Sequence, residues 1–293
     1  MKSKSMIAPM IALMLAGGVQ PRITAAGDPP AKASKQSGYT LTQLDTGINS
    51  ASVVQHLSEN GVAIGDVLAP EFKSFAWSAQ TGLVLLTLGG SQSVATAVSR
   101  NGIVTGASAT TGDASVRGFV WTVPVGIAEI GNLGGDFTIP QSVNSSGVIV
   151  GGSLTNNDKS RAFMWTKKDG IVDLVPDADD ASARWVTDEG LVVGTIYTET
   201  TEQIFIWTEQ NGLETIRALS NAMRPDYVNS HGDLAGPYFN EDGSAGTFFW
   251  SRTTGLIDIG TLGGTEIYPT ALSETGTVVG FGTTATGEAH AFV

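Results

Sequence analysis

A repeat of 42 to 44 residues runs through the chain and limits the possible folds more than any other feature. The glycine that opens each repeat recurs at spacings of 44, 44, 42 and 43 residues. A second glycine stands before an apolar pair in six copies, as Gly61, Gly102, Gly147, Gly190, Gly232 and Gly276. Recurrence at a fixed period of this length is typical of solenoids, propellers and related repeat architectures.

Each copy contains short apolar segments that are separated by turn residues. In the last copy these are residues 256–262, a segment ending at Leu272, the pair Val278 and Val279, and residues 289–293. Short apolar segments between clusters of Gly, Asn, Ser and Thr are strand signals, and no stretch shows helical periodicity. Four strands in each such period are typical of a propeller blade. The sequence therefore predicts an all-β fold, a six-bladed β-propeller of four-stranded antiparallel blades.

The two ends of the repeat region complement each other. Residues 39–46 (YTLTQLDT) match the opening strand of a repeat, although no complete repeat precedes them. The chain stops at Val293, one residue before the expected Trp, so the last copy lacks its fourth strand. Pairing of the N-terminal strand with the strand ending at Val293 would remove two exposed edges. We expect the N-terminal strand to close the ring in this way.

Three motifs in the last copy resemble a known family. They are His290-Ala291-Phe292, the stretch 258–264 (DIGTLGG) and Val278-Val279-Gly280. On these motifs the chain resembles the extracellular HAF-repeat family, over residues 39–293. That family is defined by its repeats and not by a reaction, so the resemblance implies a secreted repeat protein and names no substrate.

The first 38 residues differ in composition from the repeats. Residues 1–26 begin with Lys2 and Lys4, continue with an apolar run from Met6 to Val19 and end on Thr24-Ala25-Ala26, a pattern that predicts a signal peptide. The run is too short for a membrane span. Residues 27–38 (GDPPAKASKQSG) read as a polar linker. We therefore expect a secreted or periplasmic, monomeric protein whose single domain is residues 39–293.

Composition excludes several function classes. The chain has a net charge of −12, and residues 1–26 carry three basic and no acidic residues, so the remainder carries −15. Such a surface repels phosphate backbones, which makes nucleic acid an unsuitable partner. Cysteine is absent, which excludes disulfides and thiol chemistry. The three histidines lack the spacing of metal ligands, and the acidic loop 177–180 lacks the distal Glu of a calcium loop, so no metal and no cofactor are expected.

The candidate site comes from comparing the copies at the innermost strand of each blade. Most copies have small or neutral residues there, such as Thr96, Ala97, Gln141 and Ser142. The large or charged departures fall in copies one, four, five and six, which are neighbours around a ring: His56, Arg184, Trp185, Arg224, Asp226, Tyr227 and Tyr268. An aromatic ring stacks on a sugar and a guanidinium binds it bidentately, so these residues predict a ligand site. The alternative is packing between blades, above all for Trp185.

A second set of cations stands four residues before the Trp of several copies, as Lys73, Arg117, Arg161 and His290. We interpret these side chains as covers for the aromatic residues of their own blades. The longer connections, such as residues 108–116 and 155–160, share one end of the predicted blades, which we call the loop face. The hairpin turns such as residues 59–61 and 145–147 share the other end, the turn face. Because binding usually occurs on long loops, we expect a ligand at the loop face.

Three functions fit these observations. The first is an exported binding module for a glycan or a surface protein, without catalysis. The second is a polysaccharide-active enzyme, a lyase or hydrolase, with a site at the central shaft, where a base and a charge neutraliser would have to converge within hydrogen-bond reach. The third is a structural or adhesive matrix protein that needs no pocket. We favour the binding module.

Overall fold

The computed structural model of the chain describes residues 41, 43–44, 51–68, 71–220 and 222–293. The predicted signal peptide and linker lie outside these residues, as does most of the predicted closing strand. The described part consists of β-strands and short turns, with one 3-10 segment, η2 (Thr111–Asp113), which confirms the all-β prediction. No helix in the described part is long and apolar enough to cross a membrane.

The described strands form five sheets that follow the order of the sequence. The first sheet contains β1 (Ser52–Leu57), β2 (Ala63–Val67), β3 (Lys73–Ser78) and β4 (Gly82–Leu86). The second contains β5 (Gly89–Val98), β6 (Val104–Thr110), β7 (Val116–Thr122), β8 (Gly126–Glu129), β9 (Gly134–Val143), β10 (Ile149–Thr155), β11 (Ser160–Thr166) and β12 (Gly170–Asp173).

The remaining strands make three smaller sheets. The third sheet contains β13 (Asp180–Val186), β14 (Val192–Tyr197), β15 (Glu202–Thr208) and β16 (Gly212–Thr215). The fourth contains β17 (Ala222–Met223), β18 (Tyr227–Val228), β19 (Leu234–Phe239), β20 (Ala245–Ser251) and β21 (Gly255–Gly260). The fifth contains β22 (Gly263–Leu272), β23 (Val278–Thr284) and β24 (Ala289–Phe292).

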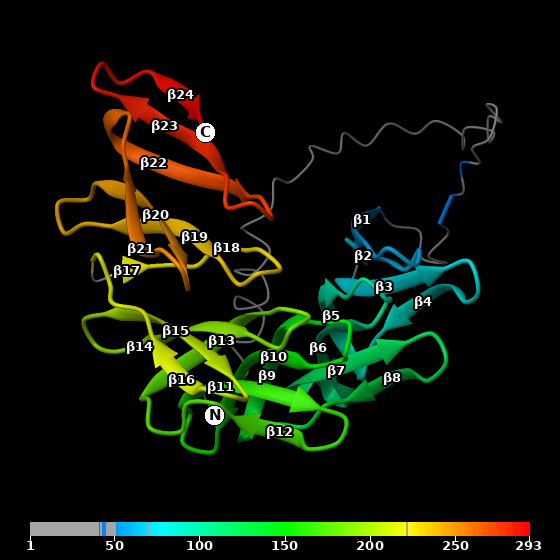
Figure 1. Ribbon diagram of the computed structural model, residues 1–293. Helices are drawn as coiled ribbons and strands as arrows, with labels where there is room; N and C mark the ends of the chain where they lie inside the picture. Colours follow the sequence, from blue (N-terminus) through cyan, green and yellow to red (C-terminus); the bar gives the residue numbers. More distant parts are fainter. Residues whose placement is uncertain (1–40, 42, 45–50, 69–70, 221) are drawn as a thin grey trace.

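The eight-stranded sheet is two antiparallel groups joined at one point. The strands β5–β8 and β9–β12 each pair antiparallel, and a single parallel pair, Val116 and Phe137, connects the two groups. Every antiparallel group therefore corresponds to one copy of the sequence repeat. The groups succeed one another along an arc, with β1 and β24 at its two ends (Figure 1).

A third glycine recurs four residues after the second glycine of each copy, and a close approach inside the sheet explains it. Gly106 on β6 lies between the neighbouring strands β5 and β7. A Cβ atom built there would lie 2.1 Å from the carbonyl oxygen of Val94 and 2.7 Å from the Phe119 ring. Only glycine allows this approach, because any side chain would collide with backbone on one side. The ring of the repeat Phe is likewise among the nearest atoms at Gly65, Gly194 and Gly280, so Gly and Phe form one packing contact in these copies.

The core lies between successive sheets. Ile64 and Ala76 of the first sheet pack with Val104 and Phe119 of the second, and all four side chains are buried. Comparable clusters join the later sheets. The recurring phenylalanines are at most 1% exposed: Phe75, Phe119, Phe163, Phe205 and Phe248. Burial of these apolar faces is the main stabilising contribution that the repeat supplies.

The recurring tryptophans are less uniform than their spacing predicts. Trp121 is 2% exposed and belongs to the core between β1–β4 and β5–β8. Trp165 and Trp207 are only half-buried and lie at the edge of their clusters. Trp165 therefore contributes less to the core than Trp121 does. The Phe two positions earlier fills that role, because it sits over the repeat glycine.

The C-terminal end of the arc exposes a position that is buried in the other copies. The last sheet has three described strands, as the sequence predicts, and β24 pairs only with β23 in the described residues. Val279 is 36% exposed, whereas the residues at its position in the other copies are 0% exposed: Ile64, Thr105, Val150, Val193 and Ala235. Of the predicted closing strand only Leu41, Gln43 and Leu44 are described, and these three residues are outside any strand.

Candidate functional site

The hairpin turns between the first and second strands of successive sheets are tied together on the turn face. In each tie an asparagine amide donates to a backbone carbonyl of the next turn. The four bonds are Asn60 Nδ2 to Asn101 O at 2.6 Å, Asn101 Nδ2 to Ser145 O at 2.7 Å, Asn144 Nδ2 to Thr187 O at 2.9 Å and Asn229 Nδ2 to Ser273 O at 3.1 Å. The turns thus form a hydrogen-bonded series around the centre of this face.

Two carboxylates reinforce the series. Asp188 accepts hydrogen bonds from the backbone N–H of Ser145 at 2.8 Å and from its hydroxyl at 3.2 Å. Glu274 accepts the equivalent bonds from Ser230, at 3.0 Å from the N–H and 2.5 Å from the hydroxyl. The bond from the Ser230 hydroxyl, and to a smaller extent the bond from its N–H, hold the pKa of the Glu274 carboxyl below its usual value. The carboxylate of Glu274 is therefore ionised near neutral pH.

The series is interrupted between the third and fourth sheets. Among the described residues, no hydrogen bond joins the turn at Thr187 to the turn at Asn229. A different contact joins the two sheets there, because the indole Nε1 of Trp185 donates to the carbonyl of Pro225 at 2.9 Å. Beside it Arg184 Nη1 lies 3.5 Å from Asp226 Oδ1. The Trp185 indole and the Arg184–Asp226 ion pair thus connect these two sheets, where the other sheets are connected by a turn-to-turn hydrogen bond.

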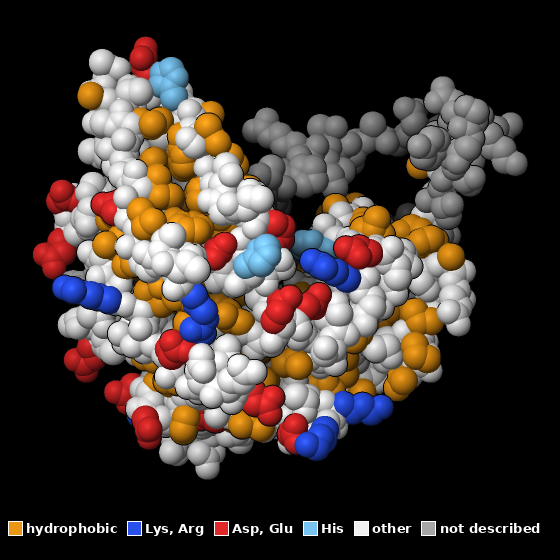
Figure 2. All heavy atoms as spheres, viewed as in Figure 1, with side chains coloured by type: hydrophobic (Ala, Val, Ile, Leu, Met, Phe, Trp, Pro, Cys, Tyr) orange, Lys and Arg blue, Asp and Glu red, His pale blue; other side chains and the backbone are white. Residues whose placement is uncertain are grey.

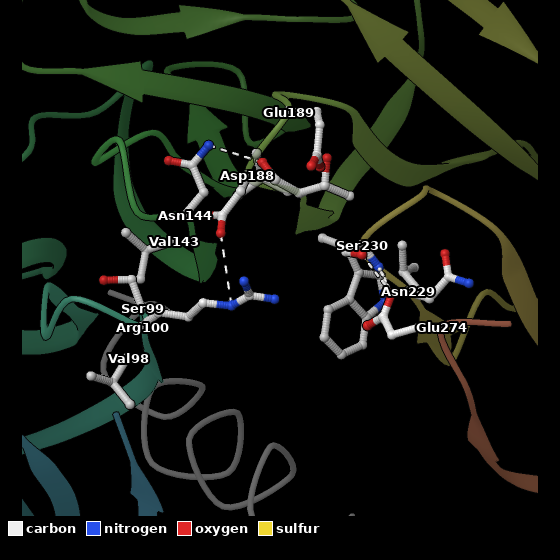
Figure 3. Close-up of a pocket in the computed structure, with 14 residues that line it drawn as sticks. Val98, Ser99, Arg100, Val143, Asn144, Asp188, Glu189, Asn229, Ser230 and Glu274 are labelled. Carbon is white, nitrogen blue, oxygen red and sulfur yellow. Dashed lines mark hydrogen bonds and ion pairs between the residues drawn. The ribbon is translucent and has the colours of Figure 1, made fainter. Parts of the chain in front are cut away.

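A cavity of about 340 Å³ opens where these turns converge (Figure 3). Its apolar wall is formed by Val98, Val143, Val186, Val228 and the half-buried Trp185. Its polar groups come from the turns and include Ser99, Arg100, Asn144, Thr187, Asp188, Glu189, Asn229, Ser230 and Glu274. The cavity therefore combines one large aromatic ring with several hydrogen-bonding groups, which is the usual composition of a ligand site.

Acidic groups outnumber basic groups at this cavity. Arg100 is the single cation among its lining residues, and its Nε lies 3.8 Å from Asp188 and 3.7 Å from Glu59. Glu274 lies 3.6 Å from Nδ1 of His231. Acidic side chains, a basic side chain and histidines gather near the middle of the face drawn in Figure 2.

Three of the predicted site residues come together. Arg184 pairs with Asp226, and Tyr227 follows directly on β18. Burial and the Asp226 carboxylate raise the pKa of the Tyr227 hydroxyl, and Arg184 opposes them. Asp226 therefore offsets the positive charge of Arg184.

The remaining candidates are dispersed. Arg224 lies 5.0 Å over the ring of Phe239, a cation–π contact within its own sheet. Tyr268 packs against Phe281 with ring centroids 5.7 Å apart. His56 is exposed on β1. Of the seven predicted residues only Trp185 lines the cavity, and that cavity lies on the turn face and not on the loop face where a ligand was expected.

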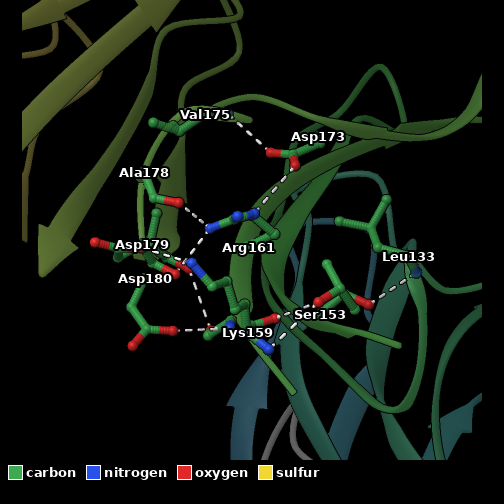
Figure 4. Close-up of polar contacts among 12 residues, drawn as sticks. Leu133, Ser153, Lys159, Arg161, Asp173, Val175, Ala178, Asp179 and Asp180 are labelled. Atoms are coloured by element: carbon green, nitrogen blue, oxygen red, sulfur yellow. Dashed lines mark hydrogen bonds and ion pairs between the residues drawn. The ribbon is translucent and has the colours of Figure 1, made fainter. Parts of the chain in front are cut away.

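The cation set and the acidic loop have structural contacts on the loop face (Figure 4). The Arg161 guanidinium donates to the carbonyls of Ala178 and Asp179 and lies 3.6 Å from Asp173. Lys159 Nζ lies 2.6 Å from Asp179. Arg161 therefore ties β11 to the segment before β13 instead of covering only its own blade. No cluster of potential metal ligands occurs in the described residues.

Sequence reasoning missed the turn residues that line the cavity, although a signal was present. The residue two places before the second glycine is charged in four copies, as Glu59, Arg100, Asp188 and Glu274. The candidate residues came from the innermost strand of each copy, and the turn that follows this strand was not included. Extending the comparison by four residues would have found Asp188, Glu189 and Glu274.

Comparisons with known proteins concern the fold alone. No family model and no curated protein matches the chain. The β-propeller domain of the Trilobed protease from Pyrococcus furiosus is similar, with a TM-score of 0.51 at 8% identity over 82% of this chain and 94% of that one. This likeness supports the β-propeller fold.

Two further structures are similar at lower scores. TolB from Acinetobacter baumannii has a TM-score of 0.47 at 12% identity over 75% of this chain, which spans 59% of the TolB chain. Virginiamycin B lyase from Staphylococcus aureus has a TM-score of 0.48 at 11% identity over 82% of each chain. At these scores and identities neither likeness assigns a ligand or a reaction.

Proposed function

We propose that this β-propeller is an exported binding module that holds a glycan of a cell surface or matrix in the turn-face cavity. The observation that carries the proposal is the convergence of turns from several sheets on one cavity that has an indole in its wall. Stacking on an aromatic ring and hydrogen bonds from polar side chains are how proteins hold sugars, and Trp185 and the hydroxyl of Ser230 provide such groups at this cavity.

Trp185 is suited to this role because its orientation is fixed. Its Nε1 is engaged by the carbonyl of Pro225, and the Arg184–Asp226 pair lies on the neighbouring residues. A rigid, half-buried ring loses little conformational freedom when a ligand stacks on it. We therefore assign Trp185 to contact with the ligand, and Arg184, Asp226 and Tyr227 to positioning it.

We also propose that the ring has six blades and is closed by residues 39–46. The support is the exposure of Val279 and of Phe281, which is 48% exposed, at positions that are buried in most other copies. The P. furiosus propeller domain has an open velcro topology, so an open ring is the alternative outcome. The signal-peptide pattern of residues 1–26 supports export, and the motifs near His290 support membership of the HAF-repeat family.

A glycan array probed with the secreted protein tests the binding function. We expect the native protein to retain specific glycans, Trp185→Ala to lose them, and the matched variant Trp207→Ala to keep them. Trp207 is also half-buried but lies outside the cavity. Turnover of a retained polysaccharide by the native protein would favour the enzyme alternative, and absence of any retained glycan would contradict the proposal.

A further inference from the structure

The electrostatic character of the turn-face cavity limits which glycan it can hold. Three carboxylates, Asp188, Glu189 and Glu274, line it together with one guanidinium, that of Arg100. Arg100 is shared between two acids, Glu59 and Asp188. The single positive group of the cavity is therefore already engaged by protein carboxylates and is not free for an anionic ligand.

Two of the carboxylates remain without a strong cationic partner. Glu189 has no ion pair and no side-chain hydrogen bond in the part of the chain that the structure describes. Besides Ser230, Glu274 has His231 at 3.6 Å, which counters its charge only when protonated, and the more distant Arg100, which also favours the carboxylate form. A cation entering the cavity would thus meet two exposed acidic side chains and the indole of Trp185.

An aromatic wall beside uncompensated carboxylates is complementary to a protonated amine on an otherwise hydroxylated ligand. The indole attracts the cation through its ring electrons and packs on the apolar face of a sugar ring. The carboxylates accept charge-assisted hydrogen bonds from the ammonium group. An acetylated amine would lose both attractions, and a uronate would be repelled by the same carboxylates.

We propose that the cavity selects glycans that carry free, protonated amino groups over their N-acetylated or acidic counterparts. This inference rests on the proposed glycan-binding function and adds the chemical class of the ligand. The carboxylates are exposed at the mouth, so each contact is weak, and we expect a preference of about three- to tenfold in dissociation constant.

Calorimetric titration of the secreted protein with glucosamine oligomers and N-acetylglucosamine oligomers of equal length tests the proposal. At a pH where the amine is protonated and at low salt, the deacetylated oligomer should bind more tightly. The preference should shrink as salt is added, because exposed charges are screened. Equal or tighter binding of the acetylated oligomer would overturn the inference and leave the glycan-binding function standing, whereas failure of both to bind would count against both proposals.

A pair of charge-matched variants locates the effect. Glu189→Gln removes one carboxylate from the cavity and should lower the affinity for the amino oligomer about two- to fivefold while leaving the acetylated oligomer unaffected. Glu199→Gln removes the same charge from the loop face and should change neither affinity. Equal effects of the two variants would contradict the assignment. Tighter binding of oligolysine than of the amino oligomer would also overturn it, in favour of a basic peptide.

Discussion

The indole Nε1 of Trp185 donates a 2.9 Å hydrogen bond to the carbonyl of Pro225, which lies on the neighbouring sheet. The bond joins the third and fourth sheets at the one junction between β5 and β24 where the described turns are not joined to each other. The same side chain forms the aromatic wall of the cavity. Trp185 therefore has a structural contact through its nitrogen and an accessible ring surface, and the two roles can be separated by mutation.

Replacing Trp185 by Phe should separate them. The variant keeps an aromatic ring and removes the donor to Pro225, so we expect the free energy of unfolding to fall by about 1 kcal/mol.

The double variant Arg184→Ala, Tyr227→Ala should weaken ligand binding while destabilising the fold less than Trp121→Ala, which should cost about 3–5 kcal/mol. Urea unfolding measures the stability of each variant, and titration with the retained glycan measures its affinity. A larger loss in the double variant with unchanged affinity would identify these residues as packing between blades.

Asp66 should make stability depend on pH. The side chain is 1% exposed, and it accepts hydrogen bonds from the Ser74 hydroxyl and from Gln55, both at 2.5 Å. Burial raises its pKa to about 6, against the lowering effect of these two bonds. The folded state therefore holds the proton more tightly than the unfolded state does. The resulting stabilisation is complete below about pH 4 and is lost as the pH rises through 6, a change of about 3 kcal/mol.

The variant Asp66→Asn isolates this contribution, because it keeps the shape and removes the charge. Gln55 can present its amide oxygen to the new amide after rotation about its last bond. We expect the stability of the native protein relative to the variant to fall between pH 4 and pH 7 in urea unfolding experiments. A difference that stays constant over this range would show that Asp66 does not retain its proton in the folded state.

Gly106 should tolerate no side chain. In Gly106→Ala the new methyl would lie 2.1 Å from the Val94 carbonyl oxygen, so strands β5 and β6 must separate, at about 1–3 kcal/mol or more. Gly152→Ala on β10 is the control, since its nearest neighbour would be the Ser182 hydroxyl at 3.3 Å. Thermal unfolding should show a clearly lower midpoint for Gly106→Ala alone. Similar midpoints for both variants would contradict the packing contact between the repeat Gly and Phe.

Closure of the ring can be tested on the open face of the last sheet. If residues 39–46 complete that sheet and the ring closes, Phe281 is covered in solution, and Phe281→Asp should cost several kcal/mol. Leu213→Asp is matched in exposure, because Leu213 is 42% and Phe281 is 48% exposed, and it should cost little. Deleting residues 39–46 should lower the melting temperature, and deleting residues 27–38 should not. Equal melting temperatures of the two deletions would indicate an open ring.

The strand pattern was predictable because each copy carries its own local information. The equivalents of Gly106 and Phe119 stand at the same positions in the other copies, so the strands assigned in one copy can be assigned in the next. The partial exposure of Trp165 was not predictable, because spacing alone does not show which of two aromatic residues lies over the glycine. The pairing of Arg184 with Asp226 was not predictable either. The two residues come from different copies, and the register shift between Ala183 and Trp185 on β13 affects where Arg184 points.

The position of the cavity was missed for a related reason. Loop length favoured the loop face, yet Arg161 and its neighbours tie those loops together with protein contacts. The turns are shorter, but the side chains of Asn144 and Asn229 bond sideways to the next turn and leave the centre open. Whether the centre of a ring is filled depends on side chains from several copies at once, and no single repeat contains that information.

Contact of the ligand with the ring of Trp185 is the central claim, and tryptophan fluorescence tests it directly. The glycan retained most strongly on the array is titrated into the native protein, Trp185→Phe and Trp207→Phe. We predict that the ligand changes the emission of the native protein and of Trp207→Phe, and that the change disappears in Trp185→Phe. A change that persists in Trp185→Phe and is lost in Trp207→Phe would place the ligand outside the turn-face cavity and contradict the account.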